Sequence, residues 1–425
     1  MTARQLTVAL FPEASFGAAL NCVGIAQALR ERGARPVFIC LQGFSGVFSD
    51  YGFQEHHLTA GDPLTNLQRQ SSWQGFVKRH LPHFRLSPAD QLETYVAPTW
   101  EAIVDTVEAA ETPLQALLRD ISADALVLDN VAMFPAIATA GVPWIRVVSC
   151  AETELPDPGV PPYLSGLPVE DEAACAAFRR RYLAAVARPH ARLNRLRAVA
   201  GLGPLPPGEF LETSPHLNLM LTPSIVRRPR AVPLDPALYI YLEGCVRSEG
   251  PYEIPPFPRH FEPLVYVSFG SLGATDVALM ERMLAVFADV PARFLVNIGG
   301  FRDAYRAVPD NVHLDSWFPQ PSVVAKSDLF IHHGGNNSFC EALRFGVPSV
   351  VMPYCWDGHD NARRAHEVGV GRCIDRVNWT SDQLGGAVLS LLANASMRRR
   401  LAKNAARMAG QPGPQVAAAA ILDRL

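Results

Sequence analysis

A glycine-rich run near the C-terminal end constrains the fold of this chain more than any other segment. His333-Gly334-Gly335-Asn336-Asn337-Ser338 follows the apolar residues 329–331, which are typical of a buried parallel strand. The polar end of the run favours the start of a helix over residues 339–345, and Gly346 with Pro348 favours its end. A further apolar strand is expected at residues 349–352, so the segment predicts a βαβ unit.

The loop of this unit is a natural anion site. A helix that begins after such a loop directs unpaired backbone N–H groups, and the positive end of its dipole, at one point. Open α/β sheets bind ligands at the carboxyl ends of their strands. Trp317 and Gln320 before the run, with Glu341 and Asp357 after it, add an aromatic face, an amide and two carboxylates. This combination suits a nucleotide diphosphate that carries a sugar.

The order of these residues resembles a known motif. The donor-binding box of the family 1 glycosyltransferases, which are UDP-sugar-dependent enzymes with the GT-B fold, is matched by Trp317-Phe318-Pro319-Gln320, His333, Gly335, Asn337, Ser338, Glu341, Gly346-Val347-Pro348, Pro353 and Asp357. Residues 265–271 and the strand, turn and helix expected over residues 6–32 are similar to the same family. The spacing between Trp317 and His333 indicates a bacterial branch. The resemblance implies an α/β protein with two facing Rossmann-like domains and the nucleotide-sugar site in the cleft between them.

The resemblance also implies how the nucleoside and the sugar would be held. Trp317 would stack on the uracil, a contact typically worth about 1–3 kcal/mol, and the Phe318 backbone would read the edge of the base. Gln320 would touch the ribose, and Glu341 would accept hydrogen bonds from two ribose hydroxyls. Asp357 would bind hydroxyls of the transferred sugar.

The diphosphate would lie at the glycine-rich loop, beside Gly335, and would be held by His333, Asn337, Ser338 and Ser271. Helix N–H groups and an imidazole that neutralise the leaving diphosphate remove the need for a divalent metal. The implied co-substrate is therefore a UDP-sugar, with no metal and no other cofactor.

Two positions depart from the family pattern. Asp357 is followed by Gly358, where the family has Gln or His, and this leaves the identity of the sugar open. The family's general base is a His, and its position falls on Ala18. A placed base contributes typically about 10²–10⁴-fold to the rate.

Several groups could compensate for Ala18. Asp129, at the end of the strand expected over residues 127–129, could act as the base or could orient one. His56, His57, Glu13 or Ser15 could reach the site instead, although His56 and His57 are expected on a surface loop. An acidic acceptor, such as a phenol or a carboxylate, would need little help. The sequence does not choose among these alternatives.

Proline-rich segments predict the domain organisation. Residues 227–236 and 250–263 are poorly periodic, as expected of a linker. We expect an N-terminal acceptor-binding Rossmann-like domain over residues 1–243, a linker over 244–263 and a C-terminal nucleotide-sugar-binding domain over 264–409. By resemblance, a last helix within residues 410–425 packs back on the N-terminal domain. A chain of 425 residues is long enough for two such cores.

The acceptor pocket is expected in the N-terminal domain, because two of its spans match the family poorly and are rich in large apolar side chains. The candidate wall residues are Trp73, Phe76, Phe84, Tyr95, Trp100, Pro161, Pro162, Tyr163, Phe178 and Tyr182. Such a lining suits a small hydrophobic or aromatic acceptor.

The amino-acid composition and net charge argue against several other classes of function. With 48% hydrophobic and 19% charged residues the chain is globular, and no apolar run approaches the ~20 residues that span a bilayer. The formal net charge of −3 gives no electrostatic case for nucleic acid. The eight cysteines follow no metal-ligand pattern, and the N-terminus is expected to be a first strand rather than a signal peptide; both favour a cytoplasmic protein. Oligomeric state is left open, a homodimer included.

These observations predict an inverting, metal-independent hexosyltransferase that moves a sugar from UDP to a hydroxyl of a natural-product-like small molecule, as in bacterial secondary metabolism and antibiotic biosynthesis. Two alternatives remain at this stage. One is a UDP-sugar epimerase of the same fold, and the other, suggested by Ala18, is a non-catalytic nucleotide-sugar-binding partner protein. The sugar, the acceptor and the regiochemistry are not determined by the sequence.

Overall fold

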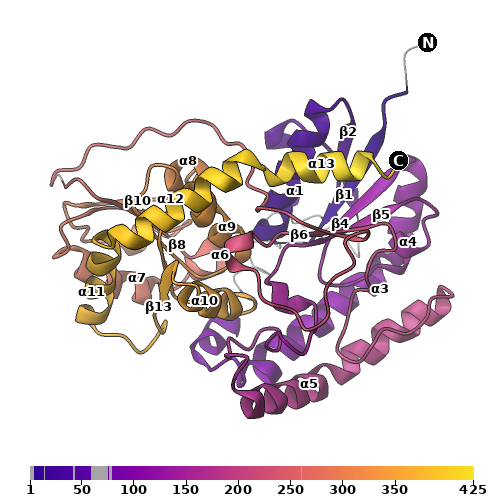
Figure 1. Cartoon of the computed structure of the whole chain (residues 1–425), viewed down its shortest axis with the longest axis horizontal. Helices are drawn as coiled ribbons and strands as arrows, with labels where there is room; N and C mark the ends of the chain where they lie inside the picture. The colour runs from indigo at the N-terminus through magenta and orange to yellow at the C-terminus, as the bar shows by residue number, and fades with distance from the viewer. Residues whose placement is uncertain (1–3, 14, 42–43, 59–74, 76–78, 260) are drawn as a thin grey trace.

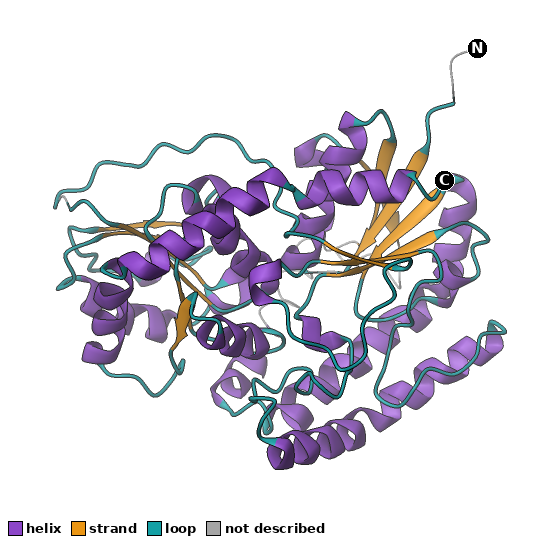
Figure 2. Ribbon diagram, in the orientation of Figure 1, coloured by secondary structure: helices purple, strands orange, loops and turns teal. Residues whose placement is uncertain are grey.

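The computed structural model describes residues 4–13, 15–41, 44–58, 75, 79–259 and 261–425. Its helices and strands form two α/β domains that lie side by side (Figure 1). Each domain is built on one parallel sheet with helices around it (Figure 2). The expected fold class is therefore confirmed. None of the helices in these ranges is long and apolar enough to cross a membrane.

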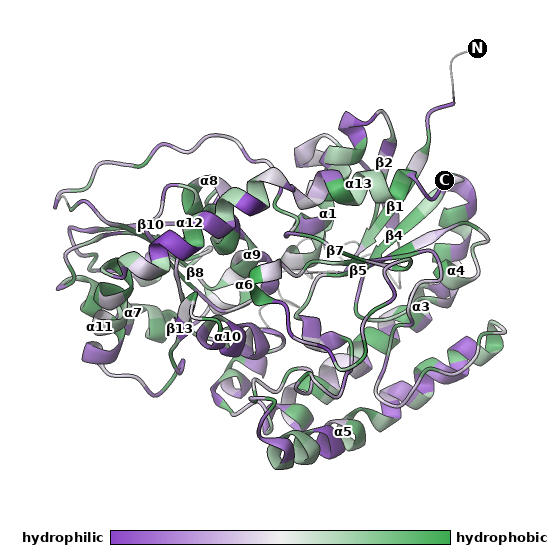
Figure 3. Ribbon diagram, in the orientation of Figure 1, coloured by the Kyte–Doolittle hydropathy of each residue, from purple (hydrophilic) through white to green (hydrophobic). Residues whose placement is uncertain are grey.

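The N-terminal sheet has the strand order β3-β2-β1-β4-β5-β6-β7, and all of its strand pairs are parallel. The strands are β1 (Thr7–Pro12), β2 (Arg35–Leu41), β3 (Gln54–Leu58), β4 (Ala125–Asp129), β5 (Trp144–Val148), β6 (Leu217–Met220) and β7 (Tyr239–Tyr241). The central strands are almost wholly apolar, as Figure 3 shows for β1 and β4. Such strands require helices on both faces of the sheet.

Alternate residues of β1 show how both faces are covered. Val8 and Leu10 pack with α1 (Phe16–Glu31) and α13 (Gly413–Leu422). Ala9 and Phe11 pack on the other face with α3 (Ala97–Ile121), α4 (Pro135–Ala138) and α5 (Glu172–Val199). The C-terminal helix α13 therefore belongs to the core of the N-terminal sheet, beside α1 (Figure 1).

The C-terminal sheet has the order β10-β9-β8-β11-β12-β13 and is also parallel. Its strands are β8 (Leu264–Ser268), β9 (Arg293–Asn297), β10 (Val312–Asp315), β11 (Leu329–His332), β12 (Ser349–Val351) and β13 (Gly371–Cys373). Its helices are α6 (Gly270–Gly273), α7 (Val277–Phe287), α8 (Gln320–Val324), α9 (Asn336–Phe345), α10 (Gly358–Glu367), α11 (Ser381–Leu392) and α12 (Ala395–Gly410).

Shorter helical turns complete the described chain. Single 3₁₀ turns lie at Ser49–Tyr51, Leu81–Arg85, Glu152–Glu154, Ser224–Val226 and Arg302–Ala304, and a π-helical turn at Leu92–Val96 leads into α3. Between β7 and β8, the described residues form no helix or strand.

The order of strands reverses beside the first strand of each sheet, between β1 and β4 and between β8 and β11. Open parallel sheets bind ligands at this point, outside the carboxyl ends of the strands. The predicted βαβ unit is present as β11, α9 and β12. Its helix begins three residues earlier than predicted, with Gly335 as N-cap, because Asn336, Asn337 and Ser338 form the first turn rather than precede it.

The end of α9 generates a prediction about stability. Gly346 caps the helix with φ +73°, and a Cβ there would lie 3.3 Å from both Ala405 Cβ and Leu401 O. Gly346→Ala is therefore expected to lower the free energy of unfolding by about 1–2 kcal/mol, measured by urea unfolding. Gly410→Ala is the matched control, because a Cβ at Gly410 meets nothing within 4 Å. Equal losses in the two variants would contradict the role of the left-handed cap.

Candidate functional site

The two domains meet at the amino-terminal ends of α9 and α10. The Asn336 side-chain amide donates hydrogen bonds to the carbonyls of Ser149 and Leu221 at 2.9 and 3.0 Å. The Asp360 carboxylate accepts hydrogen bonds from Thr153 Oγ1 at 2.7 Å and from the backbone N–H groups of Leu164 and Gly166 at 2.7 and 2.8 Å. The glycine-rich loop is therefore held against the N-terminal domain.

Steric contacts explain the two glycines of this loop. Gly334 has φ +92°, and a Cβ there would lie 2.6 Å from the carbonyl oxygen of Gly358. A Cβ at Gly335 would lie 2.5 Å from His333 Nε2. The backbone thus runs directly over the imidazole and under the first turn of α10, where no side chain fits.

The same contact accounts for Gly358, the residue that departs from the family pattern. A Cβ at Gly358 would lie 2.6 Å from the carbonyl oxygen of His333. A Gln or His could not occupy this position while the two loops touch. The space beside Asp357 is therefore shaped without that side chain.

His333 is half-buried between the two turns that follow β8 and β11. Its ring stacks on Tyr354, with 5.2 Å between centroids, and its Cε1 would touch a Cβ at Gly270 at 3.2 Å. Desolvation, with the nearby charge of Arg376, lowers the pKa of His333 to about 4. The imidazole is therefore neutral near pH 7, so it offers a hydrogen bond rather than a positive charge to an anion. No motif in the sequence indicated Arg376.

Trp317, the predicted base-stacking residue, lies on the surface of the C-terminal domain. The Trp317 side chain is 62% exposed, whereas Phe318 beside it is buried. An exposed indole next to a buried aromatic core is a ready surface for a flat ring. Gln320 follows at the start of α8 and donates to Ser338 Oγ at 3.0 Å and to Glu341 Oε2 at 2.7 Å. Ser271 is exposed on α6, directly after β8.

Glu341 is fully buried, and both of its oxygens already have protein partners. Oε1 accepts from Arg247 Nη1 at 2.9 Å and from Asn337 Nδ2 at 3.3 Å, and Oε2 accepts from Gln320. Arg247 belongs to the segment between the sheets and also pairs with Glu249 at 2.5 Å. Sequence analysis missed Arg247 because an arginine in a linker follows no motif. A ribose bound at Glu341 would have to share the carboxylate with these donors.

Asp357 lies at the start of α10 and faces the first turn of α9. Its Oδ2 accepts hydrogen bonds from the Asn336 backbone N–H at 3.3 Å and from Asn361 Nδ2 at 3.2 Å. Burial, and then the charge of Asp360, raises the pKa of Asp357 to about 7. The carboxyl is therefore poised between its two protonation states near neutral pH.

On the acceptor side, Asp129 ends β4 but is only 1% exposed. It accepts a hydrogen bond of 2.5 Å from Ser149 Oγ and contacts Cys22 Sγ at 3.8 Å. Burial raises its pKa well above the ordinary range. Ala18 is buried in the first turn of α1, and its N–H is capped by the Ser15 hydroxyl at 3.4 Å. In this arrangement, Asp129 does not reach an open surface.

Glu13, directly after β1, is better exposed. It is half-buried, its N–H donates to Asp129 O at 2.6 Å, and its Oε2 accepts from Ser15 Oγ at 3.4 Å. Burial and the charge of Glu154 raise the pKa of Glu13 to about 7. A carboxyl with this pKa can accept a proton at neutral pH.

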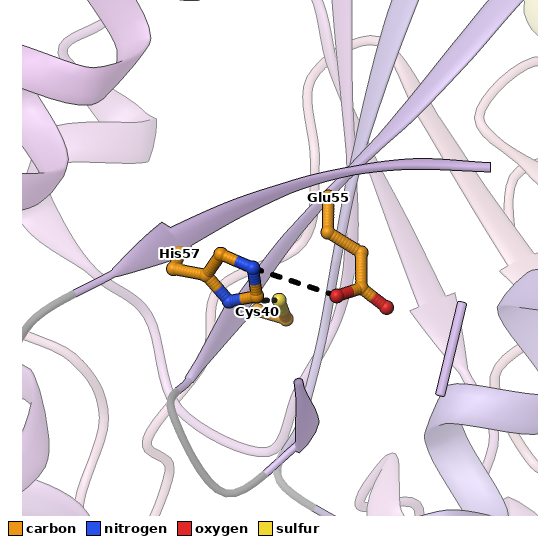
Figure 4. Close-up of side chains that lie close together, drawn as sticks. All are labelled: Cys40, Glu55 and His57. Carbon is orange, nitrogen blue, oxygen red and sulfur yellow. Dashed lines mark hydrogen bonds and ion pairs between the residues drawn. The ribbon is translucent and has the colours of Figure 1, made fainter. Parts of the chain in front are cut away.

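His56 and His57 lie on strand β3, not on a surface loop, so that expectation was wrong. Parallel pairing with β2 forms this strand despite its polar sequence, and β2 separates both residues from β1. His57 Nδ1 lies 3.4 Å from Cys40 Sγ, and His57 Nε2 lies 3.5 Å from Glu55 Oε2 (Figure 4).

This trio has metal-ligand atoms within 4.8 Å of one another. Glu55 already accepts backbone N–H groups from Gly46, Phe48 and Ser49. The Glu55 oxygens therefore hold the loop at residues 46–49, and their hydrogen bonds are made with protein groups.

A cavity of about 230 Å³ lies in the N-terminal domain. The predicted wall residues that line it are Trp100, Pro161, Pro162, Tyr163 and Tyr182. Phe84, Tyr95 and Phe178 are instead buried in the core, and Trp73 and Phe76 lie outside the described residues. The ion pair of Arg146 and Glu154, 2.6 Å apart, also lines the cavity and was not expected.

Two facing parallel-sheet domains with an anion loop at their junction define a GT-B protein. Residues 281–423 match the family described as "Erythromycin biosynthesis protein CIII-like, C-terminal domain". Oleandomycin glycosyltransferase of Streptomyces antibioticus is 30% identical over 212 residues, which cover 48% of each chain. The chain thus spans about half the length of this curated relative.

Solved structures show the same architecture over the whole chain. The glycosyltransferase of kitacinnamycin has a TM-score of 0.73 at 20% identity, with 99% of both chains covered. The glycosyltransferase VinC, in complex with DTDP, has a TM-score of 0.67 at 18% identity, again with 99% of both chains covered. The chain therefore has the GT-B fold, and part of it resembles antibiotic glycosyltransferases.

The contrast between Asp357 and Asp360 gives a prediction of pH dependence. The folded-state pKa of Asp357, about 7, lies above its unfolded value of about 3.9. Ionisation of Asp357 therefore lowers the free energy of unfolding as pH rises from about 4 to 7, and the full loss of stability is reached above pH 7. Asp357→Asn is expected to raise Tm at pH 8 and to change it little at pH 4, measured by thermal unfolding.

Asp360→Asn is the control for this measurement. Its carboxylate accepts three hydrogen bonds of 2.7–2.8 Å, so an amide donor there should lower Tm at both pH values. A lower Tm for Asp357→Asn at pH 8 would show that the Asp357 charge is stabilised rather than strained.

Proposed function

We propose that this protein is an inverting, metal-independent glycosyltransferase that moves a sugar from a nucleoside diphosphate to a hydroxyl of a small natural product. The observation that carries the proposal is the exposed Trp317, three residues before the Gln320 that donates a hydrogen bond to Ser338 in the first turn of α9. The residue before that turn is Gly335, where only glycine fits. The names of the relatives, oleandomycin glycosyltransferase and the glycosyltransferase of kitacinnamycin, support a natural-product acceptor.

The donor is proposed to be a pyrimidine nucleotide sugar. Trp317 would stack on the base, with the Phe318 backbone and Gln320 beside it. UDP is favoured by Glu341, whose carboxylate can exchange an Asn337 or Arg247 hydrogen bond for a ribose hydroxyl. A thymidine nucleotide is the second candidate, because VinC was solved with DTDP.

The diphosphate would sit at the first turn of α9. Backbone N–H groups of Asn337 and Ser338 and the hydroxyls of Ser338 and Ser271 would contact its oxygens, with His333 and Gly335 below them. Fixed dipoles of this kind stabilise the negative charge that develops on the leaving group. A divalent ion is not required for that task, and Asp357 would orient the sugar.

The acceptor is proposed to occupy the cavity lined by Trp100 and Tyr163. In a single displacement, its hydroxyl attacks the anomeric carbon opposite the leaving diphosphate, and configuration is inverted. The hydroxyl proton needs a base, and we assign this role to Glu13 rather than to Asp129. Glu13 is half-exposed with a pKa of about 7, while Asp129 is buried and hydrogen-bonded to Ser149. A cavity whose lining residue Thr153 contacts Asp360 of the C-terminal domain favours transfer over epimerisation.

Replacement of Trp317 tests the nucleotide site. Trp317→Ala is expected to weaken UDP binding by about 10- to 100-fold, since a base–aromatic stack contributes about 1–3 kcal/mol. Isothermal titration calorimetry with UDP and dTDP, with and without EDTA, gives the affinity, the preferred base and the metal requirement. Phe301→Ala removes another exposed aromatic of this domain, which is 40% exposed, and should leave both affinities unchanged. Unaltered UDP affinity in Trp317→Ala would remove the basis of the donor assignment.

Replacement of Glu13 tests the base. Glu13→Gln is expected to lower kcat by about 10²–10⁴-fold while UDP affinity is retained. In the wild type, kcat should fall as pH drops below about 7, because the base is then protonated, and the variant should lose this acid limb. Glycosylation of an aliphatic alcohol acceptor, whose hydroxyl does not ionise in this range, followed by mass spectrometry from pH 5 to 9, measures both. If Asp129→Asn loses the acid limb and Glu13→Gln keeps it, the assignment is reversed.

A further inference from the structure

Trp356 adopts a backbone conformation that a bulky side chain rarely takes. Its φ is +53°, in the left-handed region, and Ser122 and Leu164 are the other non-glycine residues with positive φ in the described ranges. A large aromatic pays a steric cost in this region, so the surrounding contacts must hold it there. Trp356 lies in the segment between β12 and α10, one residue before Asp357.

The segment that carries Trp356 is anchored in the opposite domain. Tyr354 and Cys355 are buried in the same apolar cluster as Phe11 and Trp100 of the N-terminal domain. The Gln91 side-chain amide donates to Tyr354 O at 2.8 Å. A loop of the donor domain is therefore fixed inside the acceptor domain.

The Trp356 ring continues this contact toward the acceptor cavity. Its centroid lies 5.7 Å from that of Trp100 at an interplanar angle of 45°, and 6.3 Å from that of Tyr163 at 82°. Trp100 in turn stacks on Phe210, with 3.7 Å between centroids. Trp100, Tyr163 and Phe210 all line the cavity. Trp356 is half-buried, so its ring is the donor-domain member of an aromatic cluster around the cavity.

The left-handed turn at Trp356 sends two neighbouring side chains to different partners. Asp357 faces the first turn of α9 through Asn336 and Asn361. Trp356 packs instead on the cavity wall of the other domain. A right-handed conformation at Trp356 would point the two side chains in other directions and break these contacts. The contacts therefore stabilise a φ that is unfavourable for a tryptophan.

We propose that Trp356 is a specificity-determining residue that, from the donor domain, supports the aromatic wall of the acceptor cavity through Trp100 and Tyr163 and so selects flat aromatic acceptors. This inference rests on the proposed function, because it names the acceptor class of the same site. Aromatic rings pair best in offset or edge-on arrangements with centroids about 4.5–7 Å apart. The tilted and edge-on rings around this cavity offer such faces to a phenolic ring. Arg146 and Glu154 on the same wall can orient its polar substituents.

The test uses 4-methylumbelliferone as a flat phenolic probe and UDP as the nucleotide probe. Equilibrium dialysis of the full chain measures the first affinity, and calorimetry measures the second. Trp356→Ala is expected to weaken 4-methylumbelliferone binding by about 3- to 10-fold, the loss of one aromatic pair, with UDP affinity within about twofold. Trp317→Ala is the matched control and should show the reverse pattern. Trp356→Phe should restore most of the probe affinity.

A purely structural role predicts different results. Trp356→Gly loses the ring but has no steric cost at φ +53°, so it should unfold at a higher Tm than Trp356→Ala. Both variants should nevertheless lose probe affinity equally. Probe affinity that follows Tm across the series would mean that the ring only supports the fold, and the inference would be overturned.

The remaining outcomes distinguish failure of the role proposed for Trp356 from failure of the proposed glycosyltransferase function. Unchanged probe binding in Trp356→Ala, with UDP binding lost in Trp317→Ala, overturns the inference and leaves the proposed function intact. A wild-type protein that binds UDP but not the probe also overturns it. Absence of UDP and dTDP binding in the wild type overturns the proposed function itself. Trp356→Phe and Trp356→Gly keep the test decisive if Trp356→Ala does not fold.

Discussion

The site depends on one close contact between two backbones. The loop after β11 and the first turn of α10 approach until a Cβ at either Gly334 or Gly358 would lie 2.6 Å from a carbonyl oxygen of the other segment. This contact sets Asp357 against the N–H of Asn336, and through α10 it sets Asp360 against the N-terminal domain. The two domains are thus placed relative to each other by a contact that leaves no room for side chains. A small volume change here would move both halves of the site.

The features of the fold and site that depend on local interactions could be predicted from the sequence, whereas those that depend on long-range packing could not. The β11–α9–β12 unit was predicted correctly in kind because glycine, cap residues and apolar runs act locally. The two parallel sheets followed from the same local patterns and the family resemblance. On α5, by contrast, Phe178 enters the core and Tyr182 lines the cavity, and only tertiary packing separates them. The strand containing His56 and His57 was missed because its pairing with β2, not its own sequence, makes it extended.

Contacts between the domains were the least predictable part. Arg247 comes from a segment without helix or strand, yet it forms a buried ion pair with Glu341 across 94 residues of sequence. Trp356 and Asp360 lie close to a recognised motif, but their partners belong to the spans that match the family poorly. Such partners are fixed only when two cores dock, and no local pattern encodes them. The sequence showed that Gly358 departs from the family motif. The structure explains this departure, because a Cβ at Gly358 would collide with the carbonyl oxygen of His333.

Two carboxyl groups of the site have raised pKa values, and these affect how a diphosphate would bind beside them. Glu13 and Asp357 each have a pKa of about 7, raised first by burial. The charge of Glu154 adds to this shift at Glu13, and the charges of Asp360, Glu154 and Glu13 add to it at Asp357. A dianionic diphosphate entering beside them would meet repulsion if all were ionised, and His333 is neutral, so it supplies no opposing charge. Groups that exchange protons near neutrality avoid this conflict, because protonation of one carboxyl relieves the others. In the proposed reaction, donor binding and proton release at the acceptor would be linked through these carboxyl groups, with Glu13 half-buried and Asp129 fully buried.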